Sequence, residues 1–268
     1  MRIARTAAEL REAMGPDARE GGIGLVPTMG AFHAGHLALM RTARDRCEQV
    51  VVSLFVNPAQ FGPGEDLDRY PRDEARDASM AEGAGVDILF APSSAEIYPP
   101  GFDTWVDPGR LATILEGVVR PGHFRGVATV CVKLFDIVRP AAAFFGRKDA
   151  QQVAVVKQVV RDLNLPVEIV ACPTVRDADG LALSSRNAFL SAEERAVALT
   201  LPRALDAGLE AHRSGTDAAA AARAVLDAEP RLSVDYVAEA DLDGPTLAGA
   251  VRVGSTRLID NMRLTEEA

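Results

Sequence analysis

The chain has 268 residues, 48% of them hydrophobic, which is enough for one large α/β domain or for a main domain with a smaller one attached, and excludes a disordered protein. The formal net charge of −9 at pH 7 argues against nonspecific binding to nucleic acid, because most of the surface would repel a phosphate polymer. The three cysteines are far apart and no apolar run is long enough to cross a bilayer, so we expect a cytoplasmic protein with no disulfide and no membrane partner.

Apolar runs with the length of buried strands alternate along the chain with segments of helical period. These runs are residues 23–26, 50–56, 87–90, 142–145 and 167–171. The alternation predicts an α/β fold with a Rossmann-like, doubly wound parallel sheet, which we assign to residues 1–175. Because ligands bind beyond the carboxyl ends of such strands, the polar motifs that follow the runs are the candidate site.

The composition changes after residue 187. Ser191 and Glu194 have the spacing of a capping box, which predicts a helix up to about Arg213. An Ala-rich helix and three short strands are expected to follow at residues 216–228, 234–239, 250–253 and 256–259. We therefore predict a smaller α+β domain at residues 176–268, which could close as a lid over the first domain.

The first motif, residues 26–36, reads Val-Pro-Thr-Met-Gly-Ala-Phe-His-Ala-Gly-His and joins a buried strand to an amphipathic helix at residues 37–47. The unpaired N–H groups at a helix N-terminus favour an anion, and Gly30 can take positive φ. His33 and His36, three positions apart, can face that anion as donors. A zinc site is disfavoured because no Cys, Asp or Glu lies nearby at ligand spacing.

Polar residues also follow the second strand. Gln60, in Phe-Val-Asn-Pro-Ala-Gln-Phe, offers an amide that can donate to and accept from a hydroxy acid, although a solvated loop glutamine is the simpler interpretation of this residue alone. The charged segment 65–77 indicates a solvated loop that leads into a helix. Arg120, His123 and Arg125 surround a Pro-Gly turn, where they could cap a loop or order the edge of a site or a subunit contact.

The second strong motif, residues 144–152, reads Phe-Phe-Gly-Arg-Lys-Asp-Ala-Gln-Gln and begins a helix that reaches about Leu163. The Lys148 ammonium beside the helix N-terminus would add to the attraction for a phosphate. Asp149 and Gln152 have the spacing of a capping box. The capping and binding roles compete for Gln152, since a side chain folded back on the N-cap amide cannot also hold a substrate.

The third motif is Leu-Ser-Ser-Arg-Asn at residues 183–187. Two hydroxyl groups and a guanidinium in succession can form an anion clamp, because arginine offers a forked donor and serine a short one. Ordinary turn chemistry would account for the same residues if they stood alone.

Together these stretches resemble one family. Pro-Thr-Met-Gly-Ala-x-His-x-Gly-His is similar to the signature of the HxGH nucleotidylyltransferase-like superfamily, and within it to the pantothenate synthetase (pantoate–β-alanine ligase) family, whose further motifs match the other segments. The resemblance implies an ATP-dependent condensation of pantoate with β-alanine that gives pantothenate, AMP and diphosphate through a pantoyl adenylate, as the last step of pantothenate biosynthesis. It also implies Mg²⁺ bound with ATP, small-molecule substrates only, and a homodimer.

The resemblance assigns a role to each matched residue. His33, His36 and Lys148 are expected to be catalytic. The ATP-binding residues are expected to be Met29, Gly30, Ala31, Phe32, His33, Ala34, Gly35, His36, Gly146, Arg147, Lys148, Asp149, Val175, Leu183, Ser184, Ser185 and Arg186. Pantoate is expected at Gln60 and Gln152, and β-alanine at Gln60.

Three positions need comment within this family pattern. Arg147 occupies a variable position, and its side chain is expected to point to solvent. Leu183 stands where the family usually has Met, which conserves volume for an apolar contact to adenine. Arg76 stands where an acidic residue is often found, so no protein ligand is assigned to magnesium.

Two other functions share parts of the pattern. A nucleotidylyltransferase that transfers AMP or CMP and stops there would need basic residues for an acceptor phosphate, where this chain has Gln60 and Gln152. A non-catalytic nucleotide sensor would bind ATP but release no diphosphate.

Overall fold

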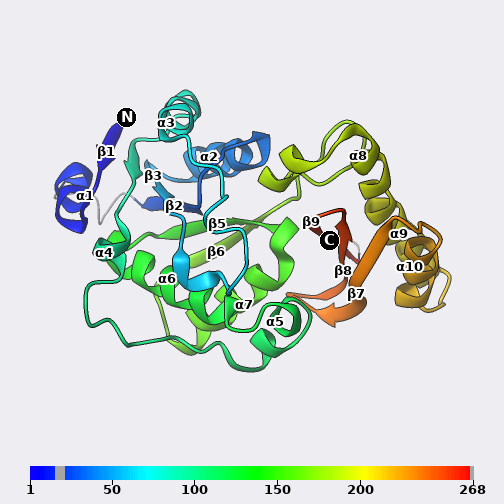
Figure 1. Cartoon of the computed structure of the whole chain (residues 1–268). Coiled ribbons are helices and arrows are strands. Elements are labelled where there is room, and N and C mark those ends of the chain that lie inside the picture. Colours follow the sequence, from blue (N-terminus) through cyan, green and yellow to red (C-terminus); the bar gives the residue numbers. More distant parts are fainter. Residues whose placement is uncertain (16–21, 266–268) are drawn as a thin grey trace. The chain divides into compact units, whose positions relative to one another are not determined.

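The structure, a computed structural model, describes residues 1–15 and 22–265. Contacts divide the chain into two compact units, one of residues 1–146 with 152–172 and one of residues 147–151 with 173–268 (Figure 1). The second unit thus starts three residues before the boundary expected from the sequence and also takes in residues 147–151. The roles of catalytic domain and lid stay predictions.

The first unit is built on a six-stranded sheet in which every pair of neighbouring strands is parallel. Its order is β1-β4-β3-β2-β5-β6, with bounds Arg2–Ala4, Ile88–Phe90, Gln49–Leu54, Ile23–Thr28, Ala142–Gly146 and Glu168–Cys172. The predicted doubly wound parallel sheet and its five strands are confirmed. β1 was not predicted, because it has three residues, one of them buried, and forms no apolar run.

The strand order reverses between β2 and β5, which lie side by side at the centre of the sheet. The chain runs outward to β3 and β4 after β2, and to β6 after β5. Ligands of doubly wound sheets bind beyond the carboxyl ends of the strands at such a switch point. The histidine motif follows β2, and the lysine motif follows β5, as the sequence suggests.

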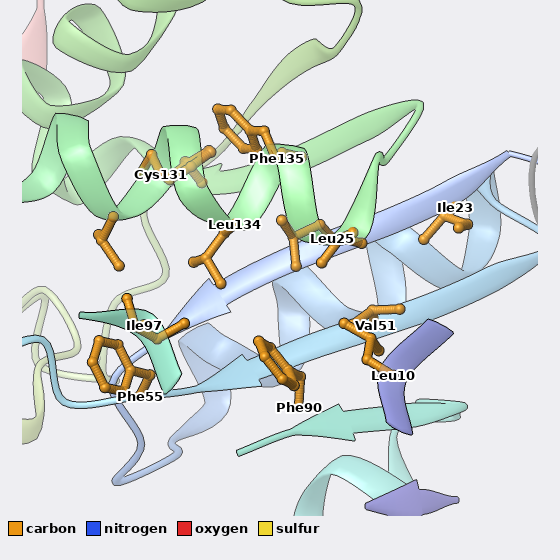
Figure 2. Close-up of a cluster of buried hydrophobic side chains, with 14 of the residues drawn as sticks. Leu10, Ile23, Leu25, Val51, Phe55, Phe90, Ile97, Cys131, Leu134 and Phe135 are labelled. Atoms are coloured by element: carbon orange, nitrogen blue, oxygen red, sulfur yellow. The ribbon is translucent and has the colours of Figure 1, made fainter. Parts of the chain in front are cut away.

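Helices cover both faces of this sheet, because successive side chains of each strand point to opposite sides. One apolar cluster joins the strands to α1 (Ala7–Met14), α4 (Ser94–Ile97), α6 (His123–Val138) and α7 (Ala150–Asp162). Figure 2 shows Leu134 of α6 pointing toward β2, the strand that carries Leu25; Cys131 and Phe135 of the same helix also belong to this cluster. The other face packs against α2 (Ala34–Arg46) and α3 (Glu74–Gly83).

Short helical segments connect these elements. They are η1 (Pro58–Gln60), η2 (Gly109–Thr113), α5 (Glu116–Val119) and, after β5, η3 (Arg147–Asp149). Four of the candidate residues lie in them: Gln60 in η1, and Arg147, Lys148 and Asp149 in η3. The path of these short segments therefore decides where those side chains lie.

The second unit packs three helices on an antiparallel sheet of order β7-β8-β9. The strands are Leu232–Asp241, Pro245–Val253 and Thr256–Arg263, and the helices are α8 (Ala192–Ala198), α9 (Thr200–Arg213) and α10 (Ala218–Asp227), with η4 (Ser185–Phe189) before them. The capping box of Ser191 and Glu194 is confirmed. The single helix predicted up to Arg213 is wrong, because Pro202 has no N–H and its ring would clash with the carbonyl of Ala198 in a continuous helix.

The three cysteines, Cys47, Cys131 and Cys172, are free. The latter two are buried, and burial raises the pKa of the Cys131 thiol, which therefore stays protonated at neutral pH. Within residues 1–15 and 22–265, no helix is both long and apolar enough to span a membrane.

Candidate active site

The turn that follows β2 is held by a buried carboxylate. Asp77 of α3 is 1% exposed and accepts the backbone N–H groups of Ala31 (2.7 Å) and Phe32 (2.8 Å). Gly30 has φ +91°, and a Cβ there would meet Leu54 Cδ1 at 2.8 Å and Asp77 Oδ2 at 3.0 Å. The glycine predicted to take positive φ does so. The turn has no room for a side chain at this position.

The two signature histidines form the N-terminal cap of α2. His33 is the N-cap residue, and its Nδ1 accepts the N–H of Gly35 at 3.1 Å. His36 Nδ1 accepts the N–H of His33 at 3.3 Å. The helix begins at Ala34 rather than at Leu37 as expected, because this reciprocal pairing satisfies N–H groups that a helix start leaves without partners.

The same pairing fixes the tautomer of both rings. A nitrogen that accepts an N–H carries no proton, so each neutral imidazole bears its proton on Nε2. The ring centroids of His33 and His36 are 4.1 Å apart, and the Phe32 ring lies 5.4 Å from that of His36. Each ring therefore carries an Nε2–H at the N-terminus of a helix, where an anion is favoured.

Gln60 lies in the same unit, and its side chain is not solvated. It is 8% exposed, its Oε1 accepts from Asn57 Nδ2 at 3.0 Å, and its Nε2 lies 3.4 Å from the Met29 sulfur. Asn57 is itself fixed by the Tyr98 hydroxyl, which donates to Asn57 Oδ1 at 2.7 Å. Burial raises the pKa of Tyr98, so this hydroxyl stays a donor at neutral pH.

The backbone of Gln60 is held by the Arg120 cluster. His123 Nδ1 donates to the Gln60 carbonyl at 2.9 Å, and His123 Nε2 lies 3.2 Å from Arg120 Nη1. Arg120 in turn binds the Glu65 carboxylate through Nε and Nη2, at 2.8 and 2.6 Å. These contacts attach Arg120 and His123 to the Gln60 backbone, and the role of the cluster at the edge of the site stays a prediction. The Arg125 guanidinium lies elsewhere, over the Trp105 ring at 4.5 Å from its centroid.

These contacts shift the protonation of the cluster. Burial and the positive charge of Arg120 lower the pKa of His123 to about 4, so the ring is neutral and accepts from arginine. Burial opposes ionisation of Glu65, but the hydrogen bonds and charge of Arg120 outweigh it and lower the pKa of that carboxyl. The cluster is thus an ion pair next to a neutral imidazole.

In the second unit, the turn with Lys148 is attached to the antiparallel sheet. Asn261 Nδ2 of β9 donates to the carbonyls of Arg147 and Lys148, both at 2.8 Å. Arg147 lies 3.9 Å from the Asp243 carboxylate and is 23% exposed, so the expectation that its side chain points to solvent is wrong. The Lys148 ammonium is 3.6 Å from Asp149.

The serine and arginine motif lies in the same unit at η4. Ser184 is the N-cap of η4, and its hydroxyl accepts the N–H of Arg186 at 3.3 Å. The hairpin before it is closed by the N–H of Leu183, which donates to the Val175 carbonyl at 2.9 Å. Strand β9 packs against both η3 and η4. The structure therefore brings Lys148 and the serine motif to one strand.

The predicted residues thus divide between the two units. The histidine motif, Gln60 and Gln152, which is half-buried in the first turn of α7, belong to the first unit, and Lys148 and residues 175–186 to the second. Asp149 directly precedes α7, as an N-cap residue would, but whether Gln152 caps the helix stays a prediction. Sequence reasoning missed Asp77 and Asn261, because each looks like an ordinary residue of a solvated segment or strand.

Comparison with known proteins agrees with this geometry. A family model described as pantoate-beta-alanine ligase matches residues 2–263. A pantothenate synthetase of Roseiflexus castenholzii is 54% identical over 97% of this chain and 98% of its own.

Solved structures give the same result. Pantothenate synthetase from Thermus thermophilus has a TM-score of 0.93 and 49% identity, with 99% of this chain and 100% of that chain covered. The pantoate-beta-alanine ligase from Francisella tularensis, complexed with beta-gamma ATP and beta-alanine, has a TM-score of 0.86 and 34% identity over 100% and 99% of the two chains. Because these matches extend over nearly the full length on both sides, the chain belongs to the pantoate–beta-alanine ligase family.

Proposed function

We propose that this enzyme joins pantoate to β-alanine through a pantoyl adenylate, with ATP converted to AMP and diphosphate. The observation that carries the proposal is the pair of Nε2–H imidazoles at the start of α2, with the buried amide of Gln60 in the same unit. Amides rather than basic side chains next to the anion site suit a hydroxy acid and argue against an acceptor phosphate. The Francisella complex, with beta-gamma ATP and beta-alanine, supports two of the three substrates.

In the first step, a pantoate carboxylate oxygen attacks the α-phosphorus of ATP, and the bond to the bridging oxygen of diphosphate breaks. Negative charge grows on the phosphoryl oxygens and on diphosphate, so donors already in place lower the barrier most. His33 and His36 donate from Nε2 to these oxygens, with His36 the active-site acid. Lys148 and residues Ser184, Ser185 and Arg186 bind the polyphosphate.

In the second step, the β-alanine amine attacks the carbonyl carbon of the mixed anhydride, AMP leaves with the bridging oxygen, and the amine loses a proton. Gln60 and Gln152 hold pantoate in both steps. The Gln60 Nε2 has a thioether, a weak acceptor, beside it, so it can donate to a stronger acceptor such as a pantoate oxygen. Water must be excluded, since the anhydride hydrolyses, and closure of the second unit would serve this.

Magnesium accompanies ATP in this proposal, held through the phosphate oxygens. Within the part of the chain that the structure describes, no three His, Cys, Asp or Glu side chains group in a way that would hold a metal ion. Asp77, the acid nearest to the signature turn, already accepts two N–H groups. No protein ligand is therefore assigned to the metal. A cytoplasmic homodimer remains the expectation from the family.

The test of this function is an exchange assay. Purified protein is incubated with ATP, Mg²⁺ and labelled diphosphate, with and without pantoate, and then with β-alanine. We expect label to enter ATP only when pantoate is present, and AMP and pantothenate to form when β-alanine is added. Formation of ADP, or exchange that needs β-alanine, would reject the adenylate.

The first prediction concerns His36 and Lys148. His36→Ala or Lys148→Ala removes a donor to the developing charge, so pantoate-dependent exchange should fall by about two or more powers of ten. Circular dichroism should show both variants folded. The matched control is His212→Ala, which changes an exposed histidine of α9 and should leave exchange as in the wild type. Near-normal exchange in either variant would refute its assigned role.

A further inference from the structure

Two segments proposed to bind the phosphates of ATP are attached to neighbouring residues of one strand. Asn261 of β9 bonds the carbonyls of Arg147 and Lys148, and Asp260, just before it, binds the Arg176 guanidinium at 2.6 and 3.0 Å. Successive side chains of a strand point to opposite faces. A single strand can therefore hold one segment on each side, although β9 lies far from both in the sequence.

The Asn261 contact fixes the orientation of the Lys148 backbone. A carboxamide nitrogen has two hydrogens, and here each goes to the carbonyl of a successive residue, at equal distances of 2.8 Å. Two consecutive peptide planes are thereby oriented, and with them the Cα–Cβ bond from which the Lys148 side chain extends. The ion pair between Arg147 and Asp243 adds a second attachment of the same turn to the sheet.

The Asp260 contact fixes the hairpin that leads to Ser184. Asp260 is 3% exposed, so its charge is desolvated and must be paired. Arg176 donates to each of its carboxylate oxygens, and the Asn261 N–H donates to Oδ1 at 2.8 Å. Arg176 Nη1 also donates to the carbonyl of Gly180 across the hairpin at 3.1 Å. Arg176 thus binds the buried Asp260 of β9 and also the Gly180 carbonyl across its own hairpin. Through these two contacts it sets the path of the chain into η4.

We propose that Asn261 is a positioning residue of the active site, which acts through Lys148, and that Asp260 and Asn261 together hold the lysine turn and the serine motif in register for the triphosphate. The inference rests on the proposed function, because Lys148 must act on ATP for its position to matter. Misplacement of such a group by about 1 Å can cost up to about a hundredfold in rate. Asp260 and Asn261 would thereby give the second unit a part in the chemistry.

The test uses Asn261→Ala, which removes both donors without adding charge, and Asn261→Asp, which keeps the shape but places carboxylate oxygens against two carbonyls. We expect each to lower kcat for pantoate-dependent exchange by about 10- to 100-fold, with the KM for pantoate unchanged. Arg252→Gln is the matched control, since it removes an exposed ion pair with Asp235 from the same sheet and should leave exchange unchanged. If kcat falls in Asn261→Asp but not in Asn261→Ala, the effect comes from the added charge, and the proposal is overturned.

A double-mutant cycle separates positioning from general stability. In a Lys148→Ala background, the further change Asn261→Ala should lower kcat for exchange by less than about twofold, because the side chain that Asn261 positions is already absent. An equal loss in both backgrounds would show that Asn261 acts elsewhere. Each variant is assayed well below its own Tm. If the wild type shows no exchange at all, the proposed function fails first; if the wild type is active and Asn261→Ala is too, only this inference fails.

Discussion

A single buried carboxylate decides the path of the chain before the signature helix. Asp77 would be costly in the interior without partners, and the two N–H groups of Ala31 and Phe32 compensate that cost. Ala31 has a positive φ of 54°, which a non-glycine residue rarely adopts without such support. The neighbouring Arg76 adds a bond from Nη2 to the Phe32 carbonyl at 3.2 Å. The position of His33 thus depends on α3.

Asp77→Asn tests this dependence. The amide would turn an NH₂ group toward one of the two N–H donors, so the free energy of unfolding should fall by about 1–3 kcal/mol and kcat for exchange by about tenfold or more. Urea denaturation and the exchange assay measure the two effects. Asp45→Asn, an exposed change on α2, is the control. Wild-type kcat in Asp77→Asn would show that the turn holds its shape without the carboxylate.

At the scale of elements, η1 and α6 approach so closely that only glycine fits between them. A Cβ on Gly126 would lie 2.2 Å from the Ala59 carbonyl oxygen and 2.7 Å from Gln60 Cα. Both are backbone atoms, so a change of side-chain rotamer cannot relieve the clash. Asn57 Nδ2 also bonds the Gly126 carbonyl at 3.2 Å. The position of the Gln60 amide is therefore set by how near helix α6 lies to η1.

Gly126→Ala should separate the two elements. We expect the free energy of unfolding to fall by about 1–3 kcal/mol, as for other overpacked sites, and the KM for pantoate to rise severalfold because Gln60 moves with η1. Thermal unfolding and initial rates at varied pantoate concentration measure these effects. Gly83→Ala, where an added Cβ meets nothing within 4 Å, should leave KM unchanged. An unchanged KM in Gly126→Ala would uncouple Gln60 from α6.

At the scale of the whole molecule, the neutral state of His123 makes stability depend on pH. Its pKa is lowered from 6.5 to about 4, so below pH 6.5 the unfolded chain takes up a proton that the folded chain does not. The free energy of unfolding should thus fall as the pH drops from about 6.5 to about 4, by up to about 3 kcal/mol. Glu65, whose pKa is lowered below 4.5, adds a loss of the same sign only at lower pH.

Urea denaturation at a series of pH values measures this dependence. His123→Asn keeps an N–H donor for the Gln60 carbonyl but cannot titrate, so its curve should be flatter than that of the wild type between about pH 6.5 and about pH 4.5. His212→Asn, at an exposed position on α9, should keep the wild-type slope. Equal slopes for His123→Asn and the wild type would contradict a neutral buried imidazole.

The sequence was most informative where one local rule applies. Apolar runs predicted five of the six strands of the parallel sheet, and the capping box at Ser191 predicted the start of α8. It was least informative where a side chain reaches a distant segment: the bonds from Asp77 to Ala31 and from Asn261 to Lys148 span 46 and 113 positions. The motifs identified the side chains that we propose to contact substrate. Spacing along the chain does not reveal the distant residues, such as Asp77 and Asn261, that fix the position of those motifs.

The histidine cap of α2 combines a structural role, which is to begin the helix, with the chemical role proposed for the same imidazoles. Asp, Ser or Asn would terminate this helix more favourably than an imidazole, yet none brings an Nε2–H to a phosphate. On the role proposed above for His33, a laboratory selection for heat resistance alone would favour Asp at position 33 and give a more stable but inactive protein. Selection for activity would then keep the weaker cap, at the cost of some stability at the first turn of α2.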